Sequence, residues 1–558
     1  MNEKLSRDIH DLCRYIAGSC TIAGAYIHGD FAVGLTARNT VIQVLEIIVG
    51  FQPRIKNYAK ILNHSNVSLL AVDKWTFERD VDKGFLGEAL VSGLIFPYIP
   101  LINQDYLHEQ EVLLKKRLIL EHLENLVLNF QELSYEFHIK PQYFMYEAML
   151  RRARLFPPML YTLSDFIKAQ ALNSNAELAL HGFLRALEEL ESEDVVAISE
   201  GFVRISKEFM KRASNHRTRF TNLLKTGQRA LFASLLGIFP QILNAISQNK
   251  EFLADFERFL DRNSIVGQQT ENPHNYIYIP TASGLVPLAN RIDIKAFAKK
   301  VLHTNRDADV QIKSIGGILN DVYLVSASKH GKESRVVVKS FRDWSSFKWF
   351  PLTLWAVGTR SFAVLGASRL QREYAMNRLL RSNGFSAPRI LHISPGERLL
   401  FMEYIEGEDL SKRIKRLLDP KNREVLQHDL NTMRRVGRLL AEIHANNIAL
   451  GDAKPENFYI DEKGEIYLMD LEQASRDGDQ SWDIAEFLYY AGHYSLVFTD
   501  SKRMEKIAKT FVEGYLKAGG NFKVVKKAGN PKYTKVFSVF TLPSIMFAVS
   551  NICRKTGD

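Results

Sequence analysis

Residues 451–470, with the sequence GDAKPENFYIDEKGEIYLMD, are the most informative stretch of this 558-residue chain. Two short apolar runs, 458–460 and 466–469, are separated by the turn-forming segment Glu-Lys-Gly. This pattern predicts a loop followed by a β-hairpin. Such a hairpin presents polar groups at its strand ends, namely the carboxylates of Asp452 and Asp470 and the carboxamide of Asn457.

These three side chains are of the kind that phosphoryl transfer from ATP requires. One group must orient the attacking hydroxyl, and oxygen ligands must hold magnesium across the phosphates. Asp452, Asn457 and Asp470 supply such oxygens. The alternative for the short string alone is a solvated turn, because Asp, Pro and Asn are common turn residues.

The run resembles the protein-kinase catalytic loop, whose usual form is His-Arg-Asp-Leu-Lys-Pro-Glu-Asn. The interval of five residues from Asp452 to Asn457 matches that family, and the interval of thirteen from Asn457 to Asp470 also fits. The resemblance implies that Asp452 and Lys454 are catalytic residues. It also implies that Asn457 and Asp470 bind magnesium.

Features upstream follow the order of the kinase fold. The β-branched run 335–339 ends in Lys339, which the resemblance places at the α and β phosphates of ATP. Gly316 and Gly317 lie between two apolar strands, where backbone amides can approach phosphate; a plain hairpin turn explains this pair equally well, because the full Gly-x-Gly-x-x-Gly pattern is absent. Glu373, on an amphipathic helix, is expected to pair with Lys339.

Residues 399–410 resemble the hinge between the two kinase lobes, where Glu403 and Ile405 are expected to bind adenine through their backbone. Residues 436–444 are expected to form the helix that precedes the catalytic loop. Asp483 lies where the superfamily has a buried aspartate that braces this loop. The resemblance therefore covers about residues 310–490.

Within the superfamily the match is closest to atypical members. The phrase Met-Glu-Tyr-Ile-Glu-Gly at 402–407 and the missing Ala-Pro-Glu segment resemble the kinase of the tRNA-modifying KEOPS complex. RIO kinases and aminoglycoside phosphotransferases share parts of the pattern, whereas Lys454 is typical of Ser/Thr protein kinases. Leu450 replaces the usual His, and Asp-Leu-Glu at 470–472 replaces Asp-Phe-Gly. An aromatic and basic insert at 344–366 is a candidate surface for partner docking.

The fold class predicted for the whole chain is α+β. Residues 1–104 are expected to form a small α/β domain, because two apolar strands flank a turn at Gly29-Asp30. This unit faintly resembles a degenerate nucleotidyltransferase, with Val41 and Gln43 where metal-binding acids would stand; an unrelated scaffold is the alternative. Residues 105–260 predict a helical domain, 261–294 a linker or extended strap, and 295–558 a two-lobed kinase-like domain.

Amino-acid composition gives weak constraints on where the protein works and on what it binds. Lys and Arg outnumber Asp and Glu by 73 to 63, so nucleic acid, acidic proteins or anionic lipid are compatible partners, although no nucleic-acid motif occurs. Three cysteines and a charged amino terminus favour a reducing, cytoplasmic location. The apolar stretches 85–102, 230–246, 350–366 and 536–549 are too short or too broken to span a membrane, although the last leaves a membrane-surface contact open.

The sequence thus predicts an ATP- and magnesium-dependent phosphotransferase, with a serine or threonine of a protein as the favoured acceptor. The first alternative is a small-molecule kinase of the aminoglycoside phosphotransferase type. The second is a nucleotide-binding pseudokinase scaffold, in which Leu450 and the Asp-Leu-Glu triplet reflect lost turnover. We expect a protein substrate or a protein partner.

Overall fold

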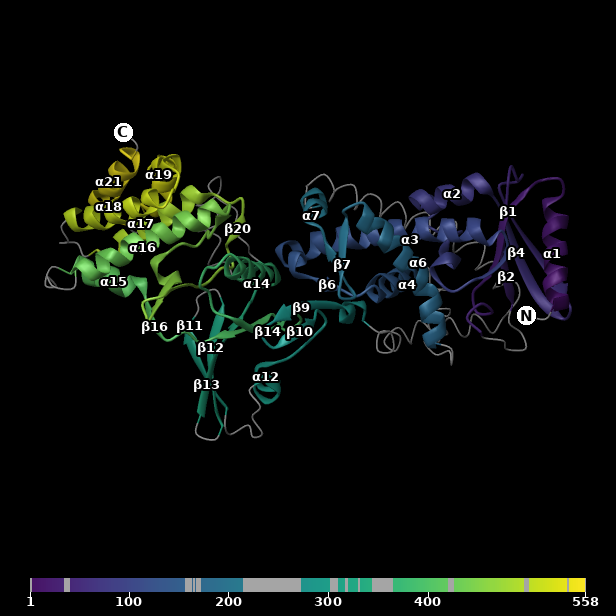
Figure 1. The fold of residues 1–558 in the computed structure, drawn as a ribbon, viewed down its shortest axis with the longest axis horizontal. Helices are drawn as coiled ribbons and strands as arrows, with labels where there is room; N and C mark the ends of the chain where they lie inside the picture. Colours follow the sequence, from purple (N-terminus) through teal and green to yellow (C-terminus); the bar gives the residue numbers. More distant parts are fainter. Residues whose placement is uncertain are drawn as a thin grey trace. The chain divides into compact units, whose positions relative to one another are not determined.

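The structure is a computed structural model of mixed helices and strands, which confirms the α+β class (Figure 1). The residues that it describes are 3–34, 41–155, 163, 166, 172–213, 272–301, 310–316, 320–329, 332–343, 365–419, 426–495, 501–538 and 541–556. The chain divides into two compact units. Unit 1 comprises residues 1–129, 137–279 and 287–289, and unit 2 comprises 130–136, 280–286 and 290–558.

Unit 1 begins with helix α1 (Glu3–Ala17) and a five-stranded sheet in the order β3-β4-β2-β1-β5. The strands are β1 (Ile22–His28), β2 (Ile42–Ile48), β3 (Ile55–Leu62), β4 (Ser65–Asp73) and β5 (Ile99–Ile102). Only β2 and β4 pair in parallel. The two strands predicted around Gly29 are confirmed as β1 and β2. Gly29 has a φ of 76°, a conformation that glycine adopts without strain.

Strand β2 carries an acid in the core of this sheet. Glu46 is 0% exposed, and among the described residues neither of its carboxyl oxygens has a hydrogen-bond partner. Burial raises the pKa of Glu46 from 4.5 to about 8, because the charged form loses its hydration. The same carboxyl lies close enough to raise the pKa of the buried Cys13 thiol on α1, where burial is the larger cause. An acid held neutral in this way is suited to packing and not to metal binding.

We expect Glu46 to make unit 1 less stable as pH rises. Below pH 4.5 the acid is protonated in both states and costs nothing; between 4.5 and about 8 only the unfolded chain releases the proton. Stability should therefore fall by about 1.4 kcal/mol per pH unit across this window. Thermal melts of Glu46→Gln and wild type, compared from pH 5 to 9, should diverge increasingly. Glu208→Gln, on an exposed position, is the control, and a constant difference between Glu46→Gln and wild type would contradict this account.

Further helices complete the described part of unit 1, and those that begin at residue 104 or later follow the predicted helical pattern. They are α2 (Lys74–Lys83), η1 (Ser92–Ile95), α3 (Gln104–Phe130), α4 (Gln142–Leu155), α6 (Leu172–Ser192) and α7 (Lys207–Ala213). The sequence did not predict the short strands β6 (His138–Ile139), β7 (Val196–Ser199) and β8 (Phe202–Ile205), which pair antiparallel. Residues 214–260 of the predicted helical domain lie outside the described residues.

The stretch expected as a linker or strap is structured where it is described. It forms η4 (Pro273–Tyr276), β9 (Ile277–Thr281) and β10 (Gly284–Pro287), followed by α12 (Ile294–Val301). Ile277, Ile279, Val286 and Leu288 are buried, so alternate apolar residues fix this segment as strands instead of a solvated linker. The short η2 helix (Gln131–Glu136) belongs to unit 2, although neighbouring residues on both sides belong to unit 1.

Unit 2 contains an antiparallel sheet in the order β11-β12-β13-β15-β14. Its strands are β11 (Val310–Gly316), β12 (Asp321–Lys329), β13 (Lys332–Ser340), β14 (Ile390–Ser394) and β15 (Leu399–Glu403). Their buried residues form a small core with Phe297 of α12. Helix α14 (Gly366–Ser382) is the predicted helix that carries Glu373, and Glu136 of η2 pairs with its Arg378 at 3.3 Å.

A second, larger hydrophobic core lies mainly among the helices and short strands that follow β15. These elements are β16 (Gly407–Asp409), α15 (Leu410–Leu418), α16 (Leu426–Ala445), β17 (Ile448–Ala449), η7 (Pro455–Asn457), β18 (Phe458–Asp461), β19 (Ile466–Leu468), β20 (Ser475–Arg476), α17 (Gln480–His493), α18 (Ser501–Lys517), α19 (Phe522–Ala528), α20 (Pro531–Phe537) and α21 (Pro543–Arg554). Helices α16 and α18 approach closely at Gly437 and Gly514, where a Cβ atom would clash with backbone carbonyl oxygens of the facing helix. The two cores give unit 2 the predicted two-lobed architecture (Figure 1).

Within the described residues, no helix has the length and apolar character needed to cross a membrane. Residues 85–102 contain only the short elements η1 and β5, and α20 ends at Phe537 and α21 begins at Pro543 within the stretch 536–549. The apolar stretches 230–246 and 350–364, with most of the candidate docking insert, lie outside the described residues.

Candidate functional site

The predicted hairpin is confirmed as strands β18 and β19, which pair antiparallel with Phe458 opposite Leu468. The ladder continues one step further, because the amide of Met469 donates to the carbonyl of Asn457 at 2.8 Å. This register places Asn457 and Asp470 at the same end of the hairpin. The twelve residues between them therefore fold back on themselves as a hairpin.

The loop before the hairpin is held by two acids of helix α17. The Asp483 carboxylate is 0% exposed and accepts hydrogen bonds from the amides of Leu450 at 2.6 Å and Gly451 at 2.7 Å. Glu486, one turn later, accepts from the amide of Ala453 at 2.7 Å. The prediction that Asp483 braces this loop is confirmed. Sequence reasoning missed Glu486, although its spacing of three from Asp483 puts both acids on one helix face.

A histidine does contact this brace, although Leu450 replaces the expected one. His444, in the last turn of α16, has Nε2 at 3.1 Å from an Asp483 oxygen and Nδ1 at 2.9 Å from the Tyr515 hydroxyl. The histidine, like Asp483, is buried. Although Leu450 replaces the usual histidine, three groups still contact the Asp483 carboxylate: the amides of Leu450 and Gly451, and His444 Nε2. No sequence signal separated His444 from an ordinary core histidine.

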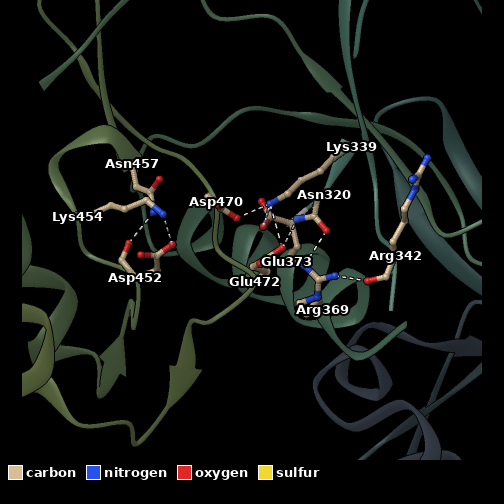
Figure 2. Close-up of polar contacts among 10 residues, drawn as sticks. All are labelled: Asn320, Lys339, Arg342, Arg369, Glu373, Asp452, Lys454, Asn457, Asp470 and Glu472. Carbon is tan, nitrogen blue, oxygen red and sulfur yellow. Dashed lines mark hydrogen bonds and ion pairs between the residues drawn. The ribbon is translucent and has the colours of Figure 1, made fainter. Parts of the chain in front are cut away.

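Asp452 and Lys454 lie together on this loop, as Figure 2 shows. The Lys454 ammonium is 2.8 Å from an Asp452 carboxylate oxygen. The side-chain amide of Asn457 donates to the backbone carbonyl of Asp452 at 2.7 Å. The Asp452 side chain is 19% exposed, so an incoming hydroxyl can reach it. Burial lowers the pKa of Lys454, but the carboxylates of Asp452 and Asp470 outweigh it and raise that pKa. Lys454 therefore carries a fixed positive charge beside the candidate base.

Lys339 and the acids around it form a cluster in the same view, in which only Asp470 is partly exposed (Figure 2). The Lys339 ammonium lies 3.0 Å from Glu373, 3.4 Å from Glu472, and in direct hydrogen-bond contact with Asp470. The Lys339 and Glu373 side chains are 7% and 2% exposed. The structure thus brings together Lys339 from β13, Glu373 from α14 and Asp470 after β19, residues far apart in the sequence.

The charges of this cluster determine one another. Burial lowers the pKa of Lys339, but Asp470, Glu373 and Glu472 together raise it well above its ordinary value. Burial opposes ionisation of Asp470, yet the ammonium groups of Lys339 and Lys454 lower its pKa. Burial raises the pKa of Glu373, which Lys339 only partly offsets. Asp470 is therefore the acid best kept ionised, as a cation ligand must be.

The backbone at Asp470 supports the same conclusion. Its φ is 54°, in the left-handed region that residues other than glycine adopt uncommonly. Aspartate tolerates this conformation better than most, and such backbone positions concentrate at functional sites. In this conformation the Asp470 carboxylate contacts the Lys339 ammonium.

The remaining predicted site residues are placed as follows. Gly316 ends β11, and Gly317 lies outside the described residues. Glu403 ends β15; its amide donates to the Arg389 carbonyl at 2.9 Å, and its carboxylate pairs with the Arg389 side chain at 3.0 Å. Ile405 follows and is buried. Both lie at the connection from the sheet to α15, as a hinge requires, while adenine binding by them remains a prediction.

The oxygen donors in this part of unit 2 are compatible with magnesium. Mg²⁺ prefers hard oxygen ligands, and Asn457 and Asp470 offer an amide oxygen and a carboxylate. The carboxylate oxygens of Glu373, Asp470 and Glu472 also lie within 4.8 Å of one another, the kind of spacing a metal ion needs. When bound, the ion would neutralise phosphate charge.

The two lobes, the Lys339–Glu373 pair and the braced loop that carries Asp452 define unit 2 as a protein-kinase-like domain of the atypical kind. Comparison with known proteins supports this conclusion: residues 311–489 match the phosphotransferase enzyme family. The chain is also similar to KEOPS complex subunit Bud32 of Pyrococcus abyssi, 28% identical over 113 residues, which are 20% of this chain and 48% of that protein.

A second relative is a probable bifunctional tRNA threonylcarbamoyladenosine biosynthesis protein of Methanocaldococcus jannaschii. It is 24% identical over 151 residues, which are 26% of this chain and 25% of that protein. The chain thus spans about a quarter to a half of the length of these two relatives. The matches support a kinase-like phosphotransferase and leave its acceptor to be determined.

Proposed function

We propose that unit 2 is an ATP- and magnesium-dependent kinase that transfers the γ-phosphoryl group to a serine or threonine hydroxyl of a protein. The observation that carries this proposal is the convergence of the buried Lys339 and Glu373 with the partly exposed Asp470 in one cluster. A buried lysine with two acids, one of them in a strained backbone conformation, suits a site where phosphates and a cation take up those charges. The presence of all these groups favours an enzyme over a pseudokinase scaffold.

Each residue has a distinct role in this proposal. Lys339, held by Glu373, contacts the α and β phosphates, while Asn457 and Asp470 ligate the magnesium that accompanies ATP. Asp452 accepts the hydrogen bond of the acceptor hydroxyl and directs its oxygen to the γ-phosphorus. Lys454, at 2.8 Å from Asp452, stands beside the transferred group with a fixed positive charge. Catalysis then depends on positioning and charge neutralisation, which dominate phosphoryl transfer.

Lys454 is the reason to favour a protein acceptor, because a lysine two residues after the catalytic aspartate is typical of Ser/Thr protein kinases. The second candidate is a small-molecule kinase, which the match of residues 311–489 to the phosphotransferase enzyme family supports. The two differ in where transferred phosphate appears, on protein or on a small hydroxyl compound.

One relative suggests protein partners, and the cytoplasmic location expected from the sequence suits an ATP-dependent enzyme. That relative is named as a subunit of the KEOPS complex, so we propose that this chain also works with protein partners. ATP and magnesium in the reducing cytoplasm would supply its substrate and ion.

Two measurements test the proposed function. Purified chain incubated with γ-labelled ATP and Mg²⁺ should transfer label to itself or to an added protein, and omission of Mg²⁺ should prevent transfer. ATP with Mg²⁺ at about 100 times its dissociation constant should also stabilise the fold by about 2.7 kcal/mol, seen as a raised melting temperature. ATP alone should give little shift, because the Asp470 carboxylate would then face phosphate without a cation. A melting temperature that Mg²⁺ and ATP together leave unchanged would refute the site.

A further inference from the structure

Arg369 lies one helical turn before Glu373 on α14 and is 0% exposed. Its guanidinium donates to the Asn320 side-chain oxygen at 2.7 Å and to the backbone carbonyl of Arg342, and it lies 3.3 Å from Glu472 (Figure 2). A fully buried guanidinium is stable only if it is paired and hydrogen-bonded. Arg369 thus connects α14 to the segments that follow β11, β13 and Asp470.

Glu472 is the other half of this arrangement. It is 2% exposed and has three donors around it: Asn320 at 2.6 Å, Arg369 at 3.3 Å and Lys339 at 3.4 Å. It stands two residues after Asp470, where glycine is usual in the related kinases. A charged side chain in place of glycine adds a buried carboxylate to a cluster that already holds the buried Glu373 and the partly exposed Asp470.

Charge balance shows what the third acid requires. Lys339 is within 3.4 Å of Glu373 and Glu472 and also contacts Asp470, so one ammonium serves three carboxylates. When Lys339 turns to the phosphates of a nucleotide, Glu472 loses that share of positive charge. Arg369 stays beside Glu472, because its carbonyl and Asn320 contacts do not involve the nucleotide. An acid with its own cation does not compete with phosphate for Lys339.

We propose that Arg369 is a positioning residue for the kinase reaction: it neutralises Glu472 and so leaves Lys339 and Asp470 available to ATP and its magnesium ion. This inference rests on the proposed function of unit 2. Arg369 touches no reacting atom and acts through Glu472. The several N–H donors of its guanidinium also hold the start of α14 against Asn320. This contact helps to fix the position of Glu373 on the same helix.

The test is a double-mutant cycle of Arg369→Met, Glu472→Gln and the two combined. Arg369→Met should lower kcat/KM for ATP by about 10- to 100-fold, with a raised KM, because Glu472 then holds Lys339. Adding Glu472→Gln removes the competing charge and should restore most of the loss. A double variant as impaired as Arg369→Met, or worse, would overturn the proposal, because a purely structural arginine is not rescued in this way.

Arg378→Met is the matched control, since it removes an arginine from the same helix whose side chain is 41% exposed and pairs with Glu136. It should change kcat/KM by less than about twofold. If Arg369→Met does not fold, Arg369→Lys and Arg369→Gln replace it. Both variants lose the planar guanidinium with its several donors, and only the lysine keeps the positive charge. The lysine variant should then be at least about tenfold more active, and equal activities would overturn the proposal.

Failure of the proposed function gives a different result. If wild-type protein transfers no phosphate to any acceptor, the function is wrong, and the same cycle is measured as dissociation constants for ATP with Mg²⁺. Weaker binding in Arg369→Met that Glu472→Gln restores would still support the positioning role. Equal binding in all four proteins would overturn it.

Discussion

Asp452→Asn is expected to lower phosphotransfer by about 10² to 10⁴-fold while ATP binding stays nearly unchanged. The substituted side chain keeps the shape of Asp452 but cannot accept a proton or hold a full negative charge against the acceptor hydroxyl. The nucleotide contacts that we propose lie elsewhere, at Lys339 and Asp470, so the dissociation constant for ATP with Mg²⁺ should move less than about threefold. Single-turnover transfer of γ-label and calorimetric titration measure the two quantities separately.

The control is Asp82→Asn, the same substitution at a side chain that is 71% exposed in unit 1. It should leave both quantities as in wild type. An Asp452→Asn protein that transfers phosphate at the original rate would exclude Asp452 as the catalytic residue. Wild-type protein that binds ATP with Mg²⁺ but transfers nothing to any acceptor would instead favour the pseudokinase scaffold.

Local pattern was enough to predict the hairpin that carries the site. Short apolar runs on both sides of a Gly turn predict β18 and β19, and the polar residues at their ends follow from strand length alone. The order of Lys339, Glu373, Asp452 and Asp470 likewise predicts a cluster that the structure shows in part: the first two and Asp470 are in contact. Asp452 is linked to them through Lys454, whose charge acts on both aspartates.

Residues whose role depends on tertiary contacts could not be predicted. Arg369 and Glu472 look like surface charges in the sequence, and only the approach of three distant segments makes them a buried pair. Glu46 shows the same limit, because nothing in an apolar strand says that its single acid faces the core. The segment 130–136 is similar: its Glu136 pairs with Arg378 on α14, more than 200 residues later in the chain.

The second large effect is expected at Asp483, which does not touch substrate. Its carboxylate accepts hydrogen bonds from two loop amides, and His444 lies at 3.1 Å from the same oxygen that Leu450 contacts. Asp483→Ala would leave these buried groups without an acceptor. Loss of one partner from a buried charged network costs about 3 to 5 kcal/mol, so the melting temperature should drop by several degrees or more. Phosphotransfer should fall as well, because the loop no longer holds Asp452 in place.

Asp479→Ala on the same helix is the control that distinguishes loss of the Asp483 contacts to the loop from a general loss of α17 stability. Asp479 is the N-cap of α17, accepting from the amide of Ser481 at 3.1 Å, and it also bonds to the Tyr533 hydroxyl at 2.6 Å. Loss of a cap typically costs about 1 kcal/mol, so this variant should be mildly destabilised and should keep its activity at temperatures where it is folded. Asp483→Ala should lose activity even at such temperatures. If the two variants lose stability equally and the folded Asp483→Ala protein turns over normally, the loop is positioned by other contacts, with Glu486 the first to test because it binds the amide of Ala453.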